Sequence, residues 1–207
     1  MKRICFLIPA LVFVIIIVTN KNIIAQDVIK SVKIGDQVWT SENLNVEKFR
    51  NGDLIPEAKT NQEWMNAASD RKPAWCYFEN KTENGVKYGK MYNFWAVYDE
   101  RGLAPEGWHI PTEAEFKKLI VSAGNDLKAL MSELEGGSNK TQFNAVMGGL
   151  RFISGAFWYP GNYVMFWGAD AEEEKGACRL NLDKAKNILE IKYSTFSYGG
   201  YVRCIKD

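Results

Sequence analysis

The sequence has very little histidine and no excess of charge of either sign. A single histidine, His109, stands among 207 residues. A metal site that needs two imidazoles is therefore excluded, and histidine catalysis is restricted to one position. The 26 lysine and arginine residues nearly balance the 25 acidic ones, so the chain lacks the basic field that non-specific nucleic-acid binding requires. We therefore expect no nucleic-acid partner.

Long apolar runs are absent beyond the N-terminus. There, an apolar run over residues 4–18 follows Lys2 and Arg3, and at about 15 residues it is shorter than the roughly 20 that span a bilayer. Ala25 supplies the small residue that signal peptidase prefers. We predict a signal peptide over residues 1–25 and an exported protein, located in the periplasm, at the cell surface or outside the cell, with no membrane span after cleavage. An uncleaved anchor is the alternative.

Cleavage would leave one domain of ordinary size, residues 26–207. The signal segment carries three basic residues and no acidic one, so its removal changes the net charge from +1 to −2. Three cysteines remain, and none forms a C-x-x-C pair, which argues against a zinc or dithiol site. In an exported protein the simplest arrangement is one disulfide and one free thiol. The spacing does not choose the pair among Cys76, Cys178 and Cys204.

Capping signals predict two helices, and a periodic pattern predicts a third. Thr60–Glu63 and Thr112–Glu115 are capping boxes that precede apolar residues at helical spacing. Leucines and a methionine over residues 127–134 repeat the i, i+3, i+4, i+7 pattern before Gly136-Gly137, which closes it. Aromatic residues and glycines over residues 75–98 favour short strands and turns instead of a long helix.

Short β-prone segments occupy both ends of the domain. Residues 28–40 predict a hairpin around Gly35-Asp36. After residue 146 the expected strands are Gly149–Ile153, Tyr163–Trp167, Cys178–Leu182, Ile188–Tyr193 and Gly200–Ile205, with a hairpin loop at Asp183–Asn187. This order predicts a single α+β domain with its helices in the middle and an antiparallel sheet assembled from both ends.

Several segments together resemble a known family. They are VKIGDQVW at 32–39, YGKMYNFWAV at 88–97, APEGWHIPT at 104–112, GGLR at 148–151 and YVRCIKD at 201–207. The chain from about residue 30 to 207 thereby resembles the Fibrobacter succinogenes major paralogous domain, which is found in exported proteins of Bacteroidetes and Fibrobacter. The resemblance implies a C-type-lectin-like fold, similar to that of formylglycine-generating enzymes, with short antiparallel sheets, two or three helices and long irregular loops. It implies no activity.

The chain departs from the family pattern at two places. It has Phe166-Trp167-Gly168-Ala169 where many members have Trp-Trp-Ser-Ser, and Ala104 where many have a cysteine. The second departure leaves Cys76–Cys204 or Cys178–Cys204 as disulfide candidates. The fold relatives also include a copper-dependent oxidase whose chemistry needs two cysteines close together. Cys178 and Cys204 could meet only across strands.

Two polar features have both a functional and a structural interpretation. His109 would suit a general base, but no nucleophile lies beside it in sequence, and we favour a residue that hydrogen-bonds backbone at a strand-to-helix corner. Asp170 and Glu172 belong to an acidic cluster that could hold calcium or simply solvate a loop. The Glu-Pro-Asn and Trp-Asn-Asp signatures of lectin calcium sites are absent from the sequence. Apart from that calcium candidate, we expect no cofactor.

An aromatic turn is the main candidate for ligand binding. Pro160-Gly161 forces a turn within residues 157–163, so some of its rings should be exposed. The alternative is that the rings pack the loop onto its own core. The candidate ligand residues are Trp158, Tyr159, Asn162, Tyr163 and Arg151, with a buried ion pair as the alternative for Arg151. Tryptophans 39, 95, 108 and 167 are expected in the core.

These features together favour an exported, non-catalytic binding module that recognises a glycan or a surface protein. Loops on a rigid scaffold commonly carry such binding. Two other classes remain open from the sequence: an enzyme related to the formylglycine-generating oxidases, and a structural subunit of a surface assembly.

Overall fold

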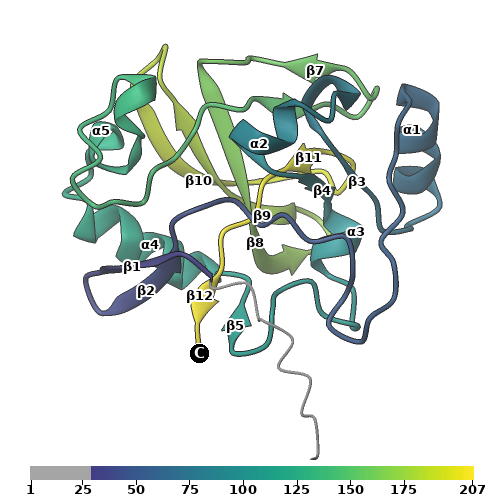
Figure 1. Ribbon diagram of the computed structural model, residues 1–207, viewed down its shortest axis with the longest axis horizontal. Coiled ribbons are helices and arrows are strands. Elements are labelled where there is room, and N and C mark those ends of the chain that lie inside the picture. The colour runs from purple at the N-terminus through teal and green to yellow at the C-terminus, as the bar shows by residue number, and fades with distance from the viewer. Residues whose placement is uncertain (1–28) are drawn as a thin grey trace, which may run out of the picture.

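The computed structural model describes residues 29–207, and the predicted signal peptide at 1–25 lies outside the described residues. The described chain forms three small antiparallel sheets with five short α-helices around them (Figure 1). The expected α+β class is confirmed at this level, although the helices number five instead of two or three. Within residues 29–207, no helix combines the length and apolar character needed to cross a membrane.

The first sheet joins the two ends of the described chain. Its strand order is β1 (Ser31–Ile34), β2 (Gln37–Thr40), β12 (Ile205–Lys206) and β5 (Trp108–His109). The predicted hairpin is confirmed, because Ile34 pairs with Gln37 across the turn. Gly35 has φ 62° there, a left-handed conformation that glycine adopts without strain.

The second and third sheets lie between the helices. The second has the order β10 (Ile188–Ser194), β9 (Gly176–Asp183) and β8 (Tyr163–Glu172). The third has the order β3 (Trp75–Cys76), β4 (Met91–Asn93), β11 (Gly199–Gly200), β6 (Leu150–Arg151) and β7 (Phe157–Trp158). The predicted strand at 200–205 is therefore divided, since β11 belongs to the third sheet and β12 to the first.

Two helices begin at the predicted capping boxes. Thr60 accepts the backbone N–H of Glu63 at the start of α1 (Asn61–Ser69), and Thr112 does the same for Glu115 at the start of α4 (Glu113–Ser122). The remaining helices are one or two turns long: α2 (Asn84–Tyr88), α3 (Phe94–Val97) and α5 (Leu127–Leu130). In Figure 1, α1 and α5 lie on opposite sides of the sheets.

The predicted helix over residues 127–134 is wrong beyond its first turn. The helix α5 ends at Leu130, and Met131 is extended with ψ 142°. Met131 instead bridges to Ala145, whose carbonyl accepts the N–H of Ser132 at 2.9 Å. A tertiary backbone pairing thus replaces the local helical one. Leu134, expected on the buried face, is 93% exposed in a short 3₁₀ turn.

Two hydrophobic clusters form the core. The first includes Trp39, which stacks on Phe116 of α4 at 6.0 Å between ring centroids. The second includes Trp167 and Trp108. Trp39, Trp108 and Trp167 are buried as predicted, whereas Trp95 is only partly buried. Val164 and Phe166 of β8 belong to the first cluster and Met165 and Trp167 to the second, so both faces of the strand that follows the Pro160-Gly161 turn are packed in the core.

Candidate functional site: an aromatic cavity

A cavity of about 390 Å³ lies beside the β6–β7 hairpin and the start of β8. Four of the predicted ligand residues line it: Trp158, Tyr159, Asn162 and Tyr163. The other lining residues, which sequence reasoning missed, are Leu150, Phe152, Arg179, Asp183, Ala185, Lys186 and Tyr198. The turn at Pro160-Gly161 therefore shapes one wall of a cavity whose remaining walls come from distant parts of the chain.

The exposed rings of this cavity are packed against one another. Trp158 is 42% exposed and Tyr159 is 54% exposed, as the turn predicts. Trp158 stacks on Phe152 with ring centroids 5.0 Å apart and touches the edge of Tyr159 at 5.5 Å. The rings are held in position without being covered, which is the property required of a binding platform.

The backbone of Tyr159 is strained. Its φ of 61° lies in the left-handed region, where a bulky residue is an outlier. The surrounding turn holds this conformation: the N–H of Tyr163 donates to the Tyr159 carbonyl at 3.2 Å, and Gly161 donates to Met147 at 2.8 Å. Strain of this kind costs about 1–3 kcal/mol and clusters at ligand-binding segments.

Arg179 is the main cation of the cavity. Its Nη1 donates to the hydroxyl of Tyr163 at 3.1 Å and to the sulfur of Met165 at 3.3 Å. The guanidinium also lies 5.4 Å from the ring centroid of Tyr198. Its Nε is buried and has no hydrogen-bond partner among the residues that the structure describes. The guanidinium is thus held through Nη1, while Nη2, which is not buried, has no acceptor among the described residues.

Tyr163 links this arginine to the sheet. Its hydroxyl accepts from Arg179 and donates to Oδ1 of Asn181 at 2.6 Å. Burial raises the pKa of Tyr163 to about 12, although Arg179 partly opposes that shift. The hydroxyl is therefore neutral at physiological pH and keeps both hydrogen bonds.

The alternation of apolar and polar residues along β9 places Arg179 on the polar face of the strand. In β9, Cys178, Leu180 and Leu182 are buried apolar residues, and Arg179 and Asn181 alternate with them. Because successive side chains of a strand point to opposite faces, the two polar residues share one face. An arginine on that face, one strand away from Tyr163, marks this end of the second sheet as polar.

Arg151 is a correction to the predicted site. It is completely buried and donates to three backbone carbonyls: Gly155 at 3.0 Å, Ala58 at 3.0 Å and Thr60 at 2.8 Å. Its guanidinium also packs between the rings of Trp64 and Phe157. Arg151 does not line the aromatic cavity, and because carbonyls from two loops accept its donors it forms no ion pair with a described residue.

The acidic candidates for calcium are occupied by protein groups. Asp170 accepts the backbone N–H of Glu113 at the start of α4, and Glu172 pairs with Lys175 at 2.6 Å. Over residues 29–207, histidine, cysteine and acidic side chains form no group of three or more suited to a metal ion. Calcium binding stays an untested prediction.

The predicted disulfide is not formed. Cys76, Cys178 and Cys204 are free, buried thiols. Cys76 and Cys178 belong to one hydrophobic cluster and Cys204 to the other. Burial raises the thiol pKa to about 11 at Cys76 and about 12 at Cys178 and Cys204, so all three are protonated near neutral pH. Protonated, buried thiols do not favour the thiolate chemistry of the oxidase alternative.

His109 lies at the predicted strand-to-helix corner, but its partners differ from those predicted. Its Nδ1 lies 2.7 Å from Oδ1 of Asp207, and its Nε2 lies 2.8 Å from Oε1 of Glu115. Burial lowers the histidine pKa, yet the hydrogen bonds to Glu115 and Asp207 outweigh burial and raise it. The ring therefore joins α4 to the end of the first sheet as a charge-assisted clip, in place of the expected backbone contact.

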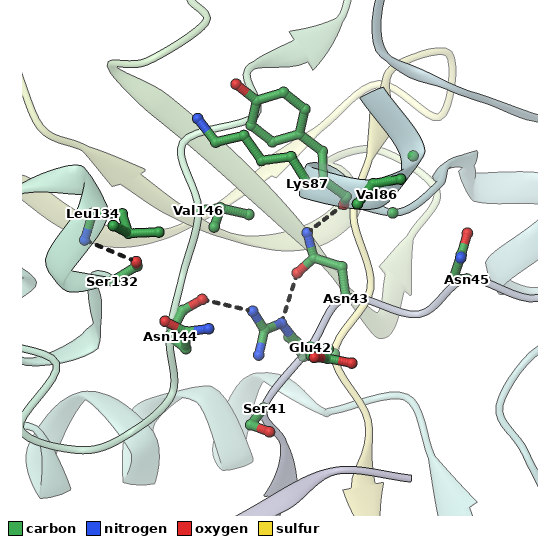
Figure 2. Close-up of a pocket in the computed structure, with 14 residues that line it drawn as sticks. Ser41, Glu42, Asn43, Asn45, Val86, Lys87, Ser132, Leu134, Asn144 and Val146 are labelled. Atoms are coloured by element: carbon green, nitrogen blue, oxygen red, sulfur yellow. Dashed lines mark hydrogen bonds between the residues drawn. The ribbon is translucent and has the colours of Figure 1, made fainter. Parts of the chain in front are cut away.

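A second cavity, of about 360 Å³, lies on another part of the surface and was not predicted (Figure 2). Its floor is Arg203, which is 1% exposed and donates to Oδ1 of Asn43 and the carbonyl of Asn144. The same guanidinium donates to the carbonyls of Thr40 and Phe143. Burial lowers its pKa to about 9, and it remains charged at neutral pH. Each guanidinium nitrogen of Arg203 has an acceptor.

The fold and its cavities define a mixed α+β domain with an aromatic, cationic pocket beside its second and third sheets. The model of the Fibrobacter succinogenes major domain matches residues 32–206, and the chain belongs to this family. The match covers nearly all of the described residues and confirms the resemblance seen in the sequence. Neither a curated protein nor a solved structure matches the chain.

Proposed function

We propose that this protein is an exported, non-catalytic binding module that holds a glycan in the aromatic cavity. The observation that carries the proposal is the pair of exposed, mutually packed rings at Trp158 and Tyr159. Such rings offer an apolar platform to the C–H face of a sugar, and Asn162 and Arg179 beside them offer polar groups that orient it.

Two further elements of the proposal rest on the sequence. Export, to the periplasm or the cell surface, follows from the signal-peptide pattern at residues 1–25. The finer fold assignment, a C-type-lectin-like domain similar to formylglycine-generating enzymes, follows from the family resemblance. The small antiparallel sheets and the long connections between them are compatible with that assignment.

The test is binding of the purified protein to a glycan panel by calorimetry. Trp158→Ala and Tyr159→Ala should each weaken binding about tenfold or more, because a buried ring–ligand contact contributes roughly 1–3 kcal/mol. Tyr98→Ala is the matched control, since Tyr98 is 65% exposed and does not line the cavity. Both cavity variants should keep the melting temperature of the unmodified protein.

Other outcomes would replace the proposal. If both cavity variants unfold, the rings act as core residues and the site assignment is wrong. If the rings are needed to bind a surface protein and no glycan binds, the ligand is a protein.

A second candidate function is a structural subunit of a surface assembly. Val86 is 96% exposed and Leu134 is 93% exposed, and both line the second cavity. Exposed apolar side chains grouped in this way are common at protein contacts. Sedimentation at increasing concentration tests this function. It predicts self-association that Val86→Ser with Leu134→Ser abolishes, and a monomer at all concentrations would contradict it.

A further inference from the structure

Hydrogen-bond satisfaction distinguishes the half-buried Arg179 from the two buried arginines, Arg151 and Arg203. All three guanidinium nitrogens of Arg151 donate to carbonyls, and those of Arg203 donate to carbonyls and to Asn43. Only Nη1 of Arg179 has acceptors among the described residues. Nη2 has no acceptor within residues 29–207 and is not buried, whereas the unpartnered Nε is buried out of a ligand's reach. An oxygen of a ligand in the cavity could therefore supply the missing acceptor at Nη2.

The charge of Arg179 is also unbalanced. The cavity lining contains two cations, Arg179 and Lys186, and one carboxylate, Asp183. Asp183 is already engaged by Lys186, whose backbone N–H lies 3.0 Å and whose ammonium lies 3.6 Å from its carboxylate. Glu190, on the neighbouring strand, is paired with Lys192 at 3.0 Å. Within residues 29–207, Arg179 itself forms no salt bridge.

The position of Arg179 is fixed by neutral groups. Tyr163 accepts from its Nη1 while donating to Asn181, and the ring of Tyr198 lies under its guanidinium. None of these contacts neutralises the positive charge. A preorganised cation among aromatic side chains suits an anionic ligand, because Nη2 of Arg179 can donate a charge-assisted hydrogen bond to a carboxylate.

We infer that the cavity binds an acidic saccharide, with the carboxylate of a uronic acid unit at Arg179 and the sugar ring against Trp158 or Tyr159. This inference rests on the proposed function and specifies its ligand class. The two parts of the site have different roles. The rings contact the C–H groups of neutral and acidic sugars alike, and the arginine favours a sugar that carries a negative charge.

The experiment uses matched ligands and the purified full protein. Oligogalacturonate, oligoguluronate and oligoglucuronate are titrated by calorimetry in their acidic forms and after carboxyl reduction to the neutral sugars. We expect at least one acidic form to bind about tenfold or more tighter than its neutral counterpart, and the difference to shrink with added salt.

Variants then test whether Arg179 produces the preference for acidic over neutral sugars. Arg179→Gln should abolish the preference for the acidic form while weak binding of the neutral form persists. Arg179→Lys keeps the charge without the fork and should retain only part of the preference. Lys118→Gln is the matched control, because it removes an exposed positive charge outside this cavity. A preference that Lys118→Gln removes and Arg179→Gln leaves intact would overturn the assignment.

The remaining outcomes separate this inference from the proposed function. Equal binding of acidic and neutral forms would overturn the acidic-sugar inference and leave the glycan-binding function standing. Tight binding of a sulfated oligosaccharide, with no preference for the carboxylated forms, would overturn the uronic acid assignment. No binding of any sugar in either form would overturn both. The ligand comparison on the unmodified protein does not depend on whether the variants fold.

Discussion

The two cavities are nearly equal in volume, about 390 and 360 Å³, yet they are built in opposite ways. Each contains an arginine. The guanidinium of Arg203 is saturated by main-chain carbonyls and Asn43, so it joins its own segment to residues 40–43 and 143–144. The guanidinium of Arg179, in the cavity that Trp158 and Tyr159 also line, has acceptors at Nη1 alone and forms no salt bridge with a described residue. Cavity volume therefore does not distinguish the two cavities, and the proposed site rests instead on the unused hydrogen-bonding capacity of Arg179.

Removing the saturated arginine should have the largest effect. Arg203→Met leaves several buried carbonyls without donors, so we expect a loss of about 3–5 kcal/mol in the free energy of unfolding. Urea unfolding measures it. Arg203→Lys should recover only part of the loss, because an ammonium cannot reach all the acceptors at once. Unchanged stability in Arg203→Met would contradict the scaffold role.

The His109 clip should have an intermediate effect that depends on pH. Its pKa is raised in the folded protein, so its contribution is complete below the unfolded value of about 6.5 and is lost as pH rises through the folded pKa. His109→Gln should therefore destabilise most near pH 5.5, by no more than about 1 kcal/mol because the ring is partly solvent-screened.

Unfolding curves at pH 5.5 and pH 9 measure the His109 effect. Ligand binding in the aromatic cavity should not change in His109→Gln, since the clip touches neither cavity. If His109→Gln destabilised the protein more at pH 9 than at pH 5.5, the raised pKa of folded His109 would be contradicted.

Arg179→Met should change stability by less than about 1 kcal/mol in either direction. Its few neutral partners and unmet donor offset each other, and replacing an imperfectly paired buried charge by an apolar side chain is often neutral. Set beside Arg203→Met in the same urea series, this variant directly compares the two arginines. Equal losses in the free energy of unfolding for the two variants would contradict the different roles assigned to Arg203 and Arg179.

The smallest effect should come from Leu134→Ser, at the edge of the second cavity. The side chain is almost fully exposed, so stability should stay within about 0.5 kcal/mol of the unmodified protein. Glycan affinity should also be unchanged in calorimetry. Loss of glycan binding in this variant would indicate that the glycan binds in the second cavity.

The sequence predicted best what depends on neighbouring residues. The capping boxes at Thr60 and Thr112 start α1 and α4 because their hydrogen bonds close within three residues. The exposed rings at Trp158 and Tyr159 follow from the local turn at Pro160-Gly161. The hairpin at Gly35-Asp36 was found for the same reason.

What depends on distant partners could not be predicted in this way. The helix at 127–134 stops because Met131 bridges to Ala145. Arg151 is buried because carbonyls about 90 residues away in sequence accept its donors. The disulfide was expected from an export context, which constrains oxidation state but not which sulfur atoms meet.

One measurement compares both cavities in a single sample. In a ¹⁵N NMR titration with an acidic oligosaccharide that binds the protein, the indole N–H of Trp158 and the Nε–H of Arg179 report on the aromatic cavity. The side-chain amides of Asn43 and Asn144 report on the second cavity. We predict saturable shifts of the Trp158 and Arg179 signals while the two asparagine signals stay in place. Shifts confined to Asn43 and Asn144 would contradict the account.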